Sequence, residues 1–571
     1  MNHLPNSRLR LIMILSVVGF ALVIGRAIKI QTIDARELVR RADAQQRHVY
    51  DIPVPRGTIT DRNGNQLAQQ VTWKTLMAYP KQVVDANVTA AYIADRLGIK
   101  GRKDRRAEIT RLRGLLESDA YQVQLVRQLD PATVDDILSA HPPGLFAVPE
   151  AHRVYPFRNL AAQLLGYTDI DLQGRPNGSG LEYTLNPWLA GKPGRELEVN
   201  APDGQPLEKL QLATPHDGRN VQLTIDQVVQ AKVQSVLEDT VRQWKAKSAT
   251  AIVLDPRTGE VLAMGTAPSY DNNKAHDLSP WQLHQLTRNR AVQDMYEPGS
   301  TFKVVTFAAA LSAGIIYPQM KFHLPYEIQV ADRKIHDDAY RGPITLTASR
   351  ILQQSSNVGT VEIARQVGPH LLSKWIAKFG FGKPTALGLY QEQAGSVLPV
   401  DDWYGSSIGN IPIGQGISVT PMQMAALYST IANDGVLAEP HVIKQMQGRA
   451  PVKPTEKRII STKVDHQMVN MLKGVLDPAA GGTGVRAQIP GYTVAGKTGT
   501  AQKPIPGGYS TTDYVASFVG FLPADDPQVE VMVVVDSPRG NIFGGIVAAP
   551  AFQQIGSFLT QTLSIKPDKP R

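Results

Sequence analysis

Three short motifs in this chain carry the residue types needed for nucleophilic attack on a peptide carbonyl. They are Ser300-x-x-Lys303, Ser355-Ser356-Asn357 and Lys497-Thr498-Gly499-Thr500. A serine hydroxyl becomes a useful nucleophile only beside a base, and a lysine can be that base only when its amine is neutral. Ser300 and Lys303 are three residues apart, so on a helix they lie on one face. This spacing predicts Ser300 as a nucleophile with Lys303 as its base.

The stretch around Ser300 predicts a turn followed by a buried helix. Pro298 and Gly299 favour the turn, and apolar residues then recur at helical spacing as far as Leu311. A helix-capping serine followed by a surface lysine would give the same short pattern, so this stretch alone leaves both interpretations open. Glu297, just before the turn, is expected to interact with the helix dipole.

The order of the three motifs along the chain favours catalysis. Ser355 stands at the end of a predicted helix that begins near Thr345, and Lys497 follows a predicted strand at 492–495. Each motif is short enough to occur by chance, whereas all three in this order on the expected elements form a specific signature. The polar residues 336–338 (His-Asp-Asp) that precede the second motif are interpreted as structural.

The rest of the C-terminal region predicts an α+β domain that positions these motifs. Strands are expected at 221–225, 249–254, 260–265, 492–495, 514–521 and 529–535. Helices are expected from Asp226 to about Trp244 and at 550–563, and helical patterns dominate up to about Ile431. Strands at both ends of a long helical insert indicate one antiparallel sheet with a helical lobe attached.

The N-terminal region contains one candidate membrane span. Residues 11–30 are almost entirely apolar, and as a helix they would extend about 30 Å. Arg26 and Lys29 near the end of the run, and the lack of a small-x-small cleavage site, favour an uncleaved anchor over a signal peptide. More basic residues follow the span than precede it, so the positive-inside rule alone predicts the orientation opposite to an exported C-terminal region.

The region between the span and the catalytic motifs is expected to be a separate, non-catalytic part. Asn63-Gly64 predicts a hairpin turn after a short strand. Ion pairs are expected around this turn among Arg56, Asp61 and Arg62. Residues 78–150 alternate helical patterns with charged turns and are interpreted as a small helical insertion.

Composition limits the other classes of function. With 571 residues the chain is expected to form more than one domain. It has no cysteine, which excludes disulfides, thiolate metal sites and cysteine nucleophiles. The net charge of +9 fits an anionic cell-envelope polymer or a membrane surface, and we find no nucleic-acid-binding signature. No metal-binding or phosphate-loop motif is present, so neither a metal nor a nucleotide cofactor is expected.

With these motifs, the chain resembles the class B penicillin-binding proteins, which are serine acyltransferases. The resemblance extends over nearly the whole chain. Besides the three motifs and the anchor it includes segments at Pro55–Gly64, Arg153–Pro156, Gly178–Glu182, Gly414–Pro421 and Phe543–Gly545. It implies the penicillin-binding transpeptidase fold, an antiparallel sheet flanked by helices with a helical subdomain, and an elongated N-terminal pedestal. The expected parts are a cytoplasmic tail 1–10, an anchor 11–30, a pedestal or dimerisation domain 31–215, a transpeptidase domain 220–565 and a tail 566–571.

The resemblance also implies roles for the residues around the nucleophile. Ser300 would be acylated, and burial together with the second cation Lys497 would lower the pKa of Lys303. Ser355 would relay a proton to the departing amine. Asn357 would hold Lys303 and the substrate amide.

The last motif would hold the donor peptide. The backbone N–H groups of Ser300 and Thr500 would form the oxyanion hole. Lys497 would bind the terminal carboxylate with the hydroxyls of Thr498 and Thr500. Gly499 would let the substrate backbone lie close to the strand.

The activity that the resemblance implies is a D,D-transpeptidase inhibited covalently by β-lactams. It would cross-link D-Ala-D-Ala stem peptides of peptidoglycan to an amine of a neighbouring strand. A D,D-carboxypeptidase shares the motifs, a β-lactamase would be about half as long, and a β-lactam sensor would have several membrane spans. Glu297 before Pro-Gly-Ser is typical of the division type, with elongation and sporulation types as alternatives. The implied setting is the bacterial inner membrane, a single span with the catalytic domain outside the cytoplasm, and an FtsW/RodA-type glycan polymerase and division proteins as partners.

Overall fold

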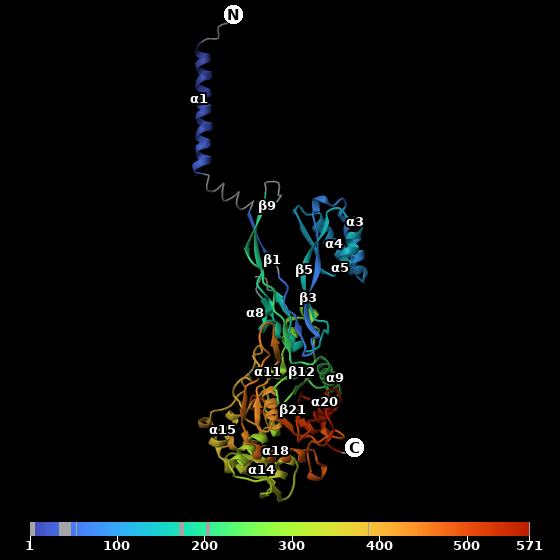
Figure 1. The fold of residues 1–571 in the computed structure, drawn as a ribbon, viewed down its shortest axis with the longest axis vertical. Helices are drawn as coiled ribbons and strands as arrows, with labels where there is room; N and C mark the ends of the chain where they lie inside the picture. The colour runs from blue at the N-terminus through green and yellow to red at the C-terminus, as the bar shows by residue number, and fades with distance from the viewer. Residues whose placement is uncertain are drawn as a thin grey trace. The chain divides into compact units, whose positions relative to one another are not determined.

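The computed structural model divides the chain into two compact units. It describes residues 6–33, 47–52, 54–170, 176–200, 206–385 and 387–569. The first unit comprises Met1–Arg56 and Ala190–Gly218, and the second comprises Gly57–Leu189 and Arg219–Arg571. Figure 1 shows the elements of both units.

The first unit contains the predicted apolar helix and a small sheet. Helix α1 (Asn6–Ile28) continues as the π-helical turn η1 (Lys29–Ile33), and its apolar side chains are exposed. The 26 residues Ser7–Thr32 are long and apolar enough to cross a membrane. The sheet has the order β1-β8-β9 and is antiparallel throughout. Its strands are β1 (Arg47–Ile52), β8 (Gly194–Asn200) and β9 (Pro206–Ala213).

The second unit begins with a sheet in which β3 is the central strand. Strand β3 pairs with β2 in the predicted hairpin and with β4 and β5, while β10 and β18 extend the sheet beyond β2. The strands are β2 (Ile59–Thr60), β3 (Gln66–Ala78), β4 (Val123–Leu129), β5 (Leu145–Val154), β10 (Val221–Leu223) and β18 (Ile443–Met446). Three helices pack on the β3–β4–β5 part: α3 (Ala86–Arg96), α4 (Arg102–Leu116) and α5 (Pro131–Ser139).

Two expectations for this region are wrong. Residues 78–150 are a mixed α/β insertion, because β4 and β5 pair with the distant β3 and a local helical pattern does not reveal that pairing. Arg62 does not form the expected ion pair with Asp61. Asp61 instead accepts hydrogen bonds from the backbone N–H groups of Asn63 and Asn65, both at 2.8 Å, and Arg62 pairs with Glu260 at 3.0 Å.

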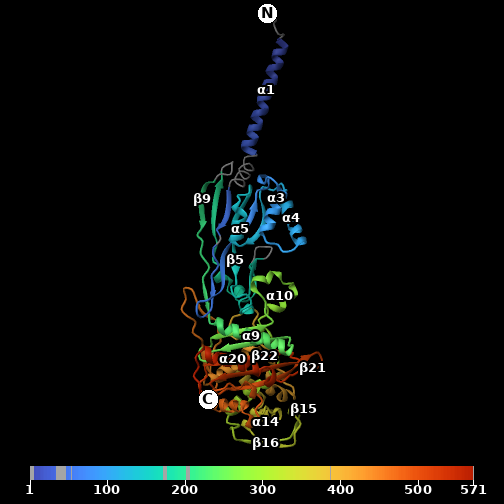
Figure 2. The ribbon, with the colours of Figure 1, turned by 90° about the vertical axis from the view of Figure 1, so that its right-hand side faces the viewer.

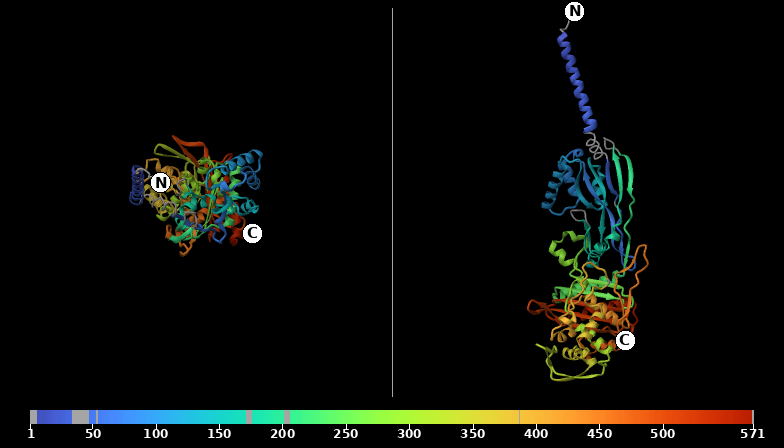
Figure 3. Two further views of the ribbon diagram at one scale, coloured as in Figure 1. Left: turned by 90° about the horizontal axis from the view of Figure 1, so that it is seen from above. Right: turned by 90° about the vertical axis from the view of Figure 1, so that its left-hand side faces the viewer.

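The centre of the second unit is the predicted single antiparallel sheet, with the order β12-β11-β22-β21-β20. The strands are β11 (Ser248–Leu254), β12 (Val261–Ala267), β20 (Ala495–Ile505), β21 (Gly508–Leu522) and β22 (Val529–Asp536). The expected strand at 492–495 is displaced, because β20 begins only at Ala495 and therefore contains the Lys497 motif. The β20–β21 hairpin extends beyond the helices beside it (Figure 3, right).

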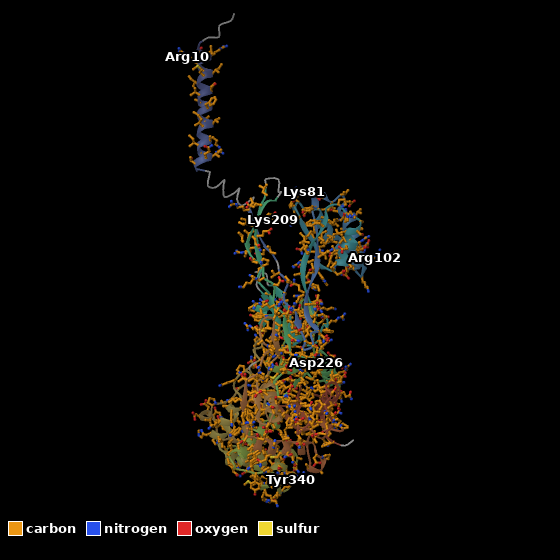
Figure 4. All side chains as sticks on the ribbon, in the orientation of Figure 1. Arg10, Lys81, Arg102, Lys209, Asp226 and Tyr340 are labelled. Carbon is orange, nitrogen blue, oxygen red and sulfur yellow. The ribbon has the colours of Figure 1, made fainter. Side chains whose placement is uncertain are left out.

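Helices cover both faces of this sheet, as Figure 2 shows. On one face lie α9 (Gln227–Trp244) and α20 (Ala549–Thr562), both close to their predicted ranges. Asp226, labelled in Figure 4, caps α9 by accepting hydrogen bonds from the N–H groups of Val228 and Val229. On the other face lie α17 (Pro421–Ala432) and α18 (Thr462–Lys473).

The helical lobe is built around α12 (Lys303–Ser312), which follows the 3-10 turn η4 (Gly299–Phe302). Its other main helices are α13 (Ala348–Gln353), α14 (Asn357–Val367) and α15 (Pro369–Lys378). Two small two-stranded sheets that were not predicted from the sequence accompany them. One pairs β13 (Lys321–Leu324) with β16 (Ile344–Thr347), and the other pairs β14 (Glu327–Val330) with β15 (Arg333–His336). The helix expected from Thr345 therefore begins at Ala348, after β16.

Shorter elements connect these layers. They are η2 (Pro80–Gln82), α6 (Ala162–Leu165), β6 (Thr168–Ile170), β7 (Pro176–Gly178), α7 (Gly180–Thr184), α8 (Asn186–Leu189), η3 (Asn272–Asp277), α10 (Pro280–Leu286), α11 (Arg290–Gln293), η5 (Val400–Asp402), α16 (Ser407–Asn410), η6 (Ile411–Ile413), β17 (Val436–Ala438), β19 (Glu456–Arg458), η7 (Gly474–Leu476), η8 (Pro478–Ala480), η9 (Val485–Ala487) and α19 (Gly544–Val547). Together they enclose one large hydrophobic core in the second unit.

Candidate active site

Ser300 lies in the 3-10 turn η4, immediately before the buried helix α12, close to the predicted position. The turn is closely packed. Gly299 has a φ of +56°, and a Cβ there would lie 3.0 Å from the Thr500 carbonyl oxygen. Tyr428 donates a hydrogen bond of 2.8 Å to the Thr301 carbonyl. The protein thus fixes the backbone on both sides of the Ser300 hydroxyl.

Lys303 is fully buried and its ammonium group is surrounded by the second motif. Its Nζ donates to the Ser355 carbonyl at 2.5 Å, to the Asn357 Oδ1 at 2.7 Å and to the Ser355 Oγ at 3.3 Å. Within the described part of the chain the Ser300 hydroxyl has no hydrogen-bond partner. Lys303 is therefore held beside Ser355, and the structure does not include a direct Ser300–Lys303 hydrogen bond.

Lys497 approaches the same hydroxyl from β20. It is also fully buried, and its Nζ donates to the Ser355 Oγ at 2.9 Å and to the Thr498 carbonyl at 3.2 Å. The Ser355 hydroxyl thus lies between two lysines. Ser355 itself has a φ of +61° in the short connection between α13 and α14. A serine in this unfavourable left-handed region is a feature of strained functional sites.

Burial sets the protonation of both lysines. It lowers the pKa of Lys303 to about 8, against an opposing effect from the nearby carboxylates of Asp338 and Asp337. Burial, and secondly the positive charge of Lys303, lower the pKa of Lys497 well below its usual value. Two ammonium groups on one hydroxyl repel each other, so one of the amines is readily neutral near physiological pH.

The second motif is held by the His336–Asp338 cluster. Asp337 accepts hydrogen bonds from the N–H groups of Asn357 and Val358 at 2.7 and 3.1 Å, which caps α14. The Asn357 Nδ2 donates to the His336 carbonyl and to Asp338. This fixes the amide so that its oxygen faces Lys303. These hydrogen bonds agree with a structural role for the cluster. The effect of Asp337 and Asp338 on the pKa of Lys303 is an addition that the sequence did not reveal.

The side chains of β20 alternate between a pocket and the protein interior. Thr498 and Thr500 line a pocket of about 560 Å³ together with Ser300 and Ser355. Gly499 faces the interior, where a Cβ would lie 2.3 Å from the Ser517 Oγ. The expectation that Gly499 gives room to the substrate therefore needs correction, because it gives room to the packing of β21 against η4 instead.

Glu297 also differs from its prediction. It is almost fully buried, and its Oε1 accepts hydrogen bonds from the Gly416 N–H at 3.0 Å and from the Tyr509 hydroxyl at 3.2 Å. Burial raises its pKa. The carboxyl group thus ties the turn before Ser300 to the β20–β21 hairpin and does not act as a partner of the α12 dipole. Sequence separation hides such a contact, since Tyr509 is more than 200 residues away.

The structure therefore assembles all three motifs at one pocket. Ser300, Ser355, Thr498 and Thr500 line it, and Lys303 and Lys497 lie behind it. Residues outside the motifs complete its wall. They include Asp337, Asp338, Arg341, Arg486 and the segment from Phe543 to Ile546. A serine, a second hydroxyl between two buried amines, and an adjoining pocket form a site suited to serine-dependent acyl transfer.

Comparison with known families gives the class of protein. Residues 249–557 match the Penicillin binding protein transpeptidase domain, and residues 51–223 match the Penicillin-binding Protein dimerisation domain. The fold is thus the penicillin-binding transpeptidase fold with a dimerisation region, as expected from the sequence.

Individual relatives extend over nearly the whole chain. Peptidoglycan D,D-transpeptidase FtsI of Escherichia coli K12 is 33% identical over 97% of this chain and 91% of its own length. Penicillin-binding protein PbpB of Mycolicibacterium smegmatis is 34% identical over 93% of this chain and 87% of its own length. The crystal structure of penicillin-binding protein 3 from Mycobacterium tuberculosis in complex with aztreonam has a TM-score of 0.69 at 29% identity, with coverage of 92% of this chain and 99% of that one. This chain belongs to the class B penicillin-binding proteins, and its enzyme class is that of the D,D-transpeptidases.

Proposed function

We propose that this D,D-transpeptidase cross-links peptidoglycan stem peptides through an acyl-enzyme on Ser300, in septal wall synthesis during cell division. The single observation that carries the catalytic proposal is the Ser355 hydroxyl held between Lys303 and Lys497 at the pocket that Ser300 lines. Stem peptides ending in D-Ala-D-Ala would be the donors and β-lactams the inhibitors. The printed names of the relatives support this substrate class.

Acylation begins with proton removal from Ser300. The neutral amine of Lys303 takes the proton, and the Ser300 Oγ forms a bond with the carbonyl carbon of the penultimate D-Ala. The backbone N–H groups of Ser300 and Thr500 stabilise the negative charge on the carbonyl oxygen. The amide bond to the terminal D-Ala then breaks. Ser355 passes a proton from the lysine pair to the departing amine.

Binding of the donor decides which lysine is neutral. We assign the terminal carboxylate of the donor to Lys497, together with the hydroxyls of Thr498 and Thr500. A carboxylate beside Lys497 favours its charged form and raises its pKa. The charged Lys497 then disfavours a second charge on Lys303, which is left as the neutral base. Asn357, hydrogen-bonded to Lys303 at 2.7 Å, orients that amine and the substrate amide.

Deacylation reverses these proton movements. An amine of a neighbouring stem peptide attacks the ester carbonyl and loses its proton through Ser355 to Lys303. The ester bond to the Ser300 Oγ then breaks, and the proton held by Lys303 restores the Ser300 hydroxyl. If water took the place of the amine, the product would be that of a D,D-carboxypeptidase. The ratio of cross-linked to hydrolysed product in the presence of an acceptor amine distinguishes the two.

The division role rests on resemblance. Glu297 before Pro-Gly-Ser is typical of the division type, and one full-length relative is an FtsI. The apolar helix Ser7–Thr32 is consistent with a single-pass anchor. We propose the inner membrane as its site, the region 220–565 outside the cytoplasm as the catalytic domain, 31–215 as the pedestal, and an FtsW/RodA-type polymerase as the partner. Depletion in cells should give filaments, whereas round cells would indicate elongation.

A labelled penicillin tests the nucleophile. Wild-type protein should form a covalent adduct at Ser300 that persists through denaturation, and Ser300→Ala should abolish it. Ser312→Ala, at the exposed end of the same helix α12, is the matched control and should label normally. Persistent labelling of the Ser300→Ala variant would disprove the assignment.

A further inference from the structure

The segment 482–487 separates two adjoining pockets. Gly482, Thr483, Val485 and Arg486 line the catalytic pocket. Val485 and Arg486 also line a second pocket of about 790 Å³, whose wall includes Lys473, Tyr492 and Lys569. The two pockets therefore meet at the Arg486 side chain.

The backbone that carries Arg486 is held in place on several sides. The Gly484 N–H donates to the Val475 carbonyl at 2.9 Å, and the Thr483 and Thr498 hydroxyls are hydrogen-bonded at 2.6 Å. A Cβ at Gly545 would lie 2.1 Å from the Thr483 carbonyl oxygen, which shows how closely the neighbouring segment packs. Ala487 is fully buried. Arg486 is thus presented from a rigid segment that is fastened directly to the strand β20.

Arg486 is the charged group of the catalytic pocket wall that is available to bind a ligand. Arg341 and Asp337 form an ion pair with each other, and Asp338 accepts a hydrogen bond from Asn357. Across the described ranges of the chain, the exposed guanidinium of Arg486 has neither a hydrogen-bond nor an ion-pair partner. A solvated surface arginine needs no partner either, but the backbone of Arg486 is fixed in a wall shared by two pockets, one of which Ser300 also lines.

We infer that Arg486 is a specificity-determining residue that binds a carboxylate of the donor peptide upstream of its D-Ala-D-Ala end. The inference rests on the proposed function, which assigns the terminal carboxylate to Lys497. A guanidinium recognises a carboxylate through two parallel hydrogen bonds. Both D-Ala side chains are methyl groups, so the residue before them is the first that can carry such a carboxylate. The second pocket then receives the remainder of the donor.

Two matched peptides test this subsite. They end in D-Ala-D-Ala and differ only in the preceding residue, which carries either a free side-chain carboxylate or its primary amide. The readout is the rate at which each peptide acylates Ser300, followed by mass spectrometry. Wild type should prefer the carboxylate peptide by about fivefold, the upper range for an ion pair exposed to water. Arg486→Glu should bring the ratio below one, and Arg486→Lys should retain part of the preference.

A control variant separates the effect of Arg486 from the effect of the net charge of the protein. Lys463→Glu changes the charge equally on the exposed surface of α18, outside both pockets, and should leave the ratio unchanged. A ratio of one in wild type, or a preference that survives Arg486→Glu, would overturn the subsite while leaving the acyl-enzyme intact. A preference lost equally in Lys463→Glu would also overturn it. Acylation by penicillin but by neither peptide would instead refute the proposed donor.

Discussion

The pKa of Lys303 predicts how the rate of acylation depends on pH. Burial lowers this pKa to about 8, and the carboxylate of Asp338 opposes that shift. Only the neutral amine can accept the proton of Ser300, so the second-order rate constant for acylation by penicillin should rise with pH and level off above about 8. Asp338→Asn removes the opposing charge. It should lower the pKa of Lys303 further and move the whole profile to lower pH.

The size of the effect follows from the titration of one group. With a pKa of about 8, the neutral fraction of Lys303 is about 1% at pH 6, about 9% at pH 7 and one half at pH 8. The wild-type rate should therefore rise about ninefold from pH 6 to pH 7. For Asp338→Asn the quantity to compare is the rate at pH 7 divided by the plateau rate of the same variant. This ratio can exceed the wild-type ratio by at most about elevenfold, because the amine is then wholly neutral at pH 7.

Stopped-flow measurement with a fluorescent penicillin between pH 6 and 9.5 checks this prediction. Asp401→Asn, an exposed carboxylate on η5, is the matched control and should leave the profile in place. Melting temperatures of both variants show whether the fold is preserved. A wild-type rate that is constant from pH 6 to pH 8, or a profile that moves to higher pH in Asp338→Asn, would refute the assignment of Lys303 as the base.

Two further predictions concern buried positions. Gly499→Ala should lower the free energy of unfolding by about 1–3 kcal/mol in denaturant titrations, because its Cβ would lie 2.3 Å from the Ser517 Oγ; unchanged stability would contradict the interior orientation of this residue. Glu530, fully buried with both carboxyl oxygens unpaired among the described residues, has a pKa raised well above its usual value by burial. Its folded state holds a proton that the unfolded chain releases, so the free energy of unfolding should fall as the pH rises above about 4.5, the ordinary pKa of a glutamate, by at most about 1.4 kcal/mol per pH unit. Glu530→Gln should remove that component, and parallel stability curves of the two proteins would refute it.

The sequence predicted those features that depend on local patterns. Strands β11 and β22 and helices α9 and α20 were found near their observed ranges, because their apolar periodicity and caps are local signals. The three motifs were likewise recognisable because their spacing is fixed by the helix or strand that carries each one. The single antiparallel sheet followed from the order of the elements along the chain.

The features that were missed depend on contacts between distant segments. The pairing of β4 and β5 with β3, and the hydrogen bond from Tyr509 to Glu297, leave no periodic trace in the sequence. The direction of Gly499 depends on which face of β20 its odd-numbered positions occupy, and this is set by the packing of β20 in the fold. Residues 497 and 499 point inward, and residues 498 and 500 point into the pocket. A motif thus identifies the reactive groups, and strand register decides which of them face the substrate.

From the two buried lysines we propose that the pocket requires a donor with a terminal carboxylate. Each Nζ lies within hydrogen-bond distance of the Ser355 Oγ, at 3.3 Å from Lys303 and 2.9 Å from Lys497. Among the described residues no carboxylate is hydrogen-bonded to either Nζ. Asp338 favours the charged forms of both amines from a longer distance, whereas burial disfavours two positive charges there. A donor carboxylate at Thr498 and Thr500 would compensate one charge and leave the other amine neutral. In this arrangement the carboxylate of the substrate leaves Lys303 neutral and able to act as the base. A donor whose terminal carboxylate is amidated should therefore bind without activating Ser300.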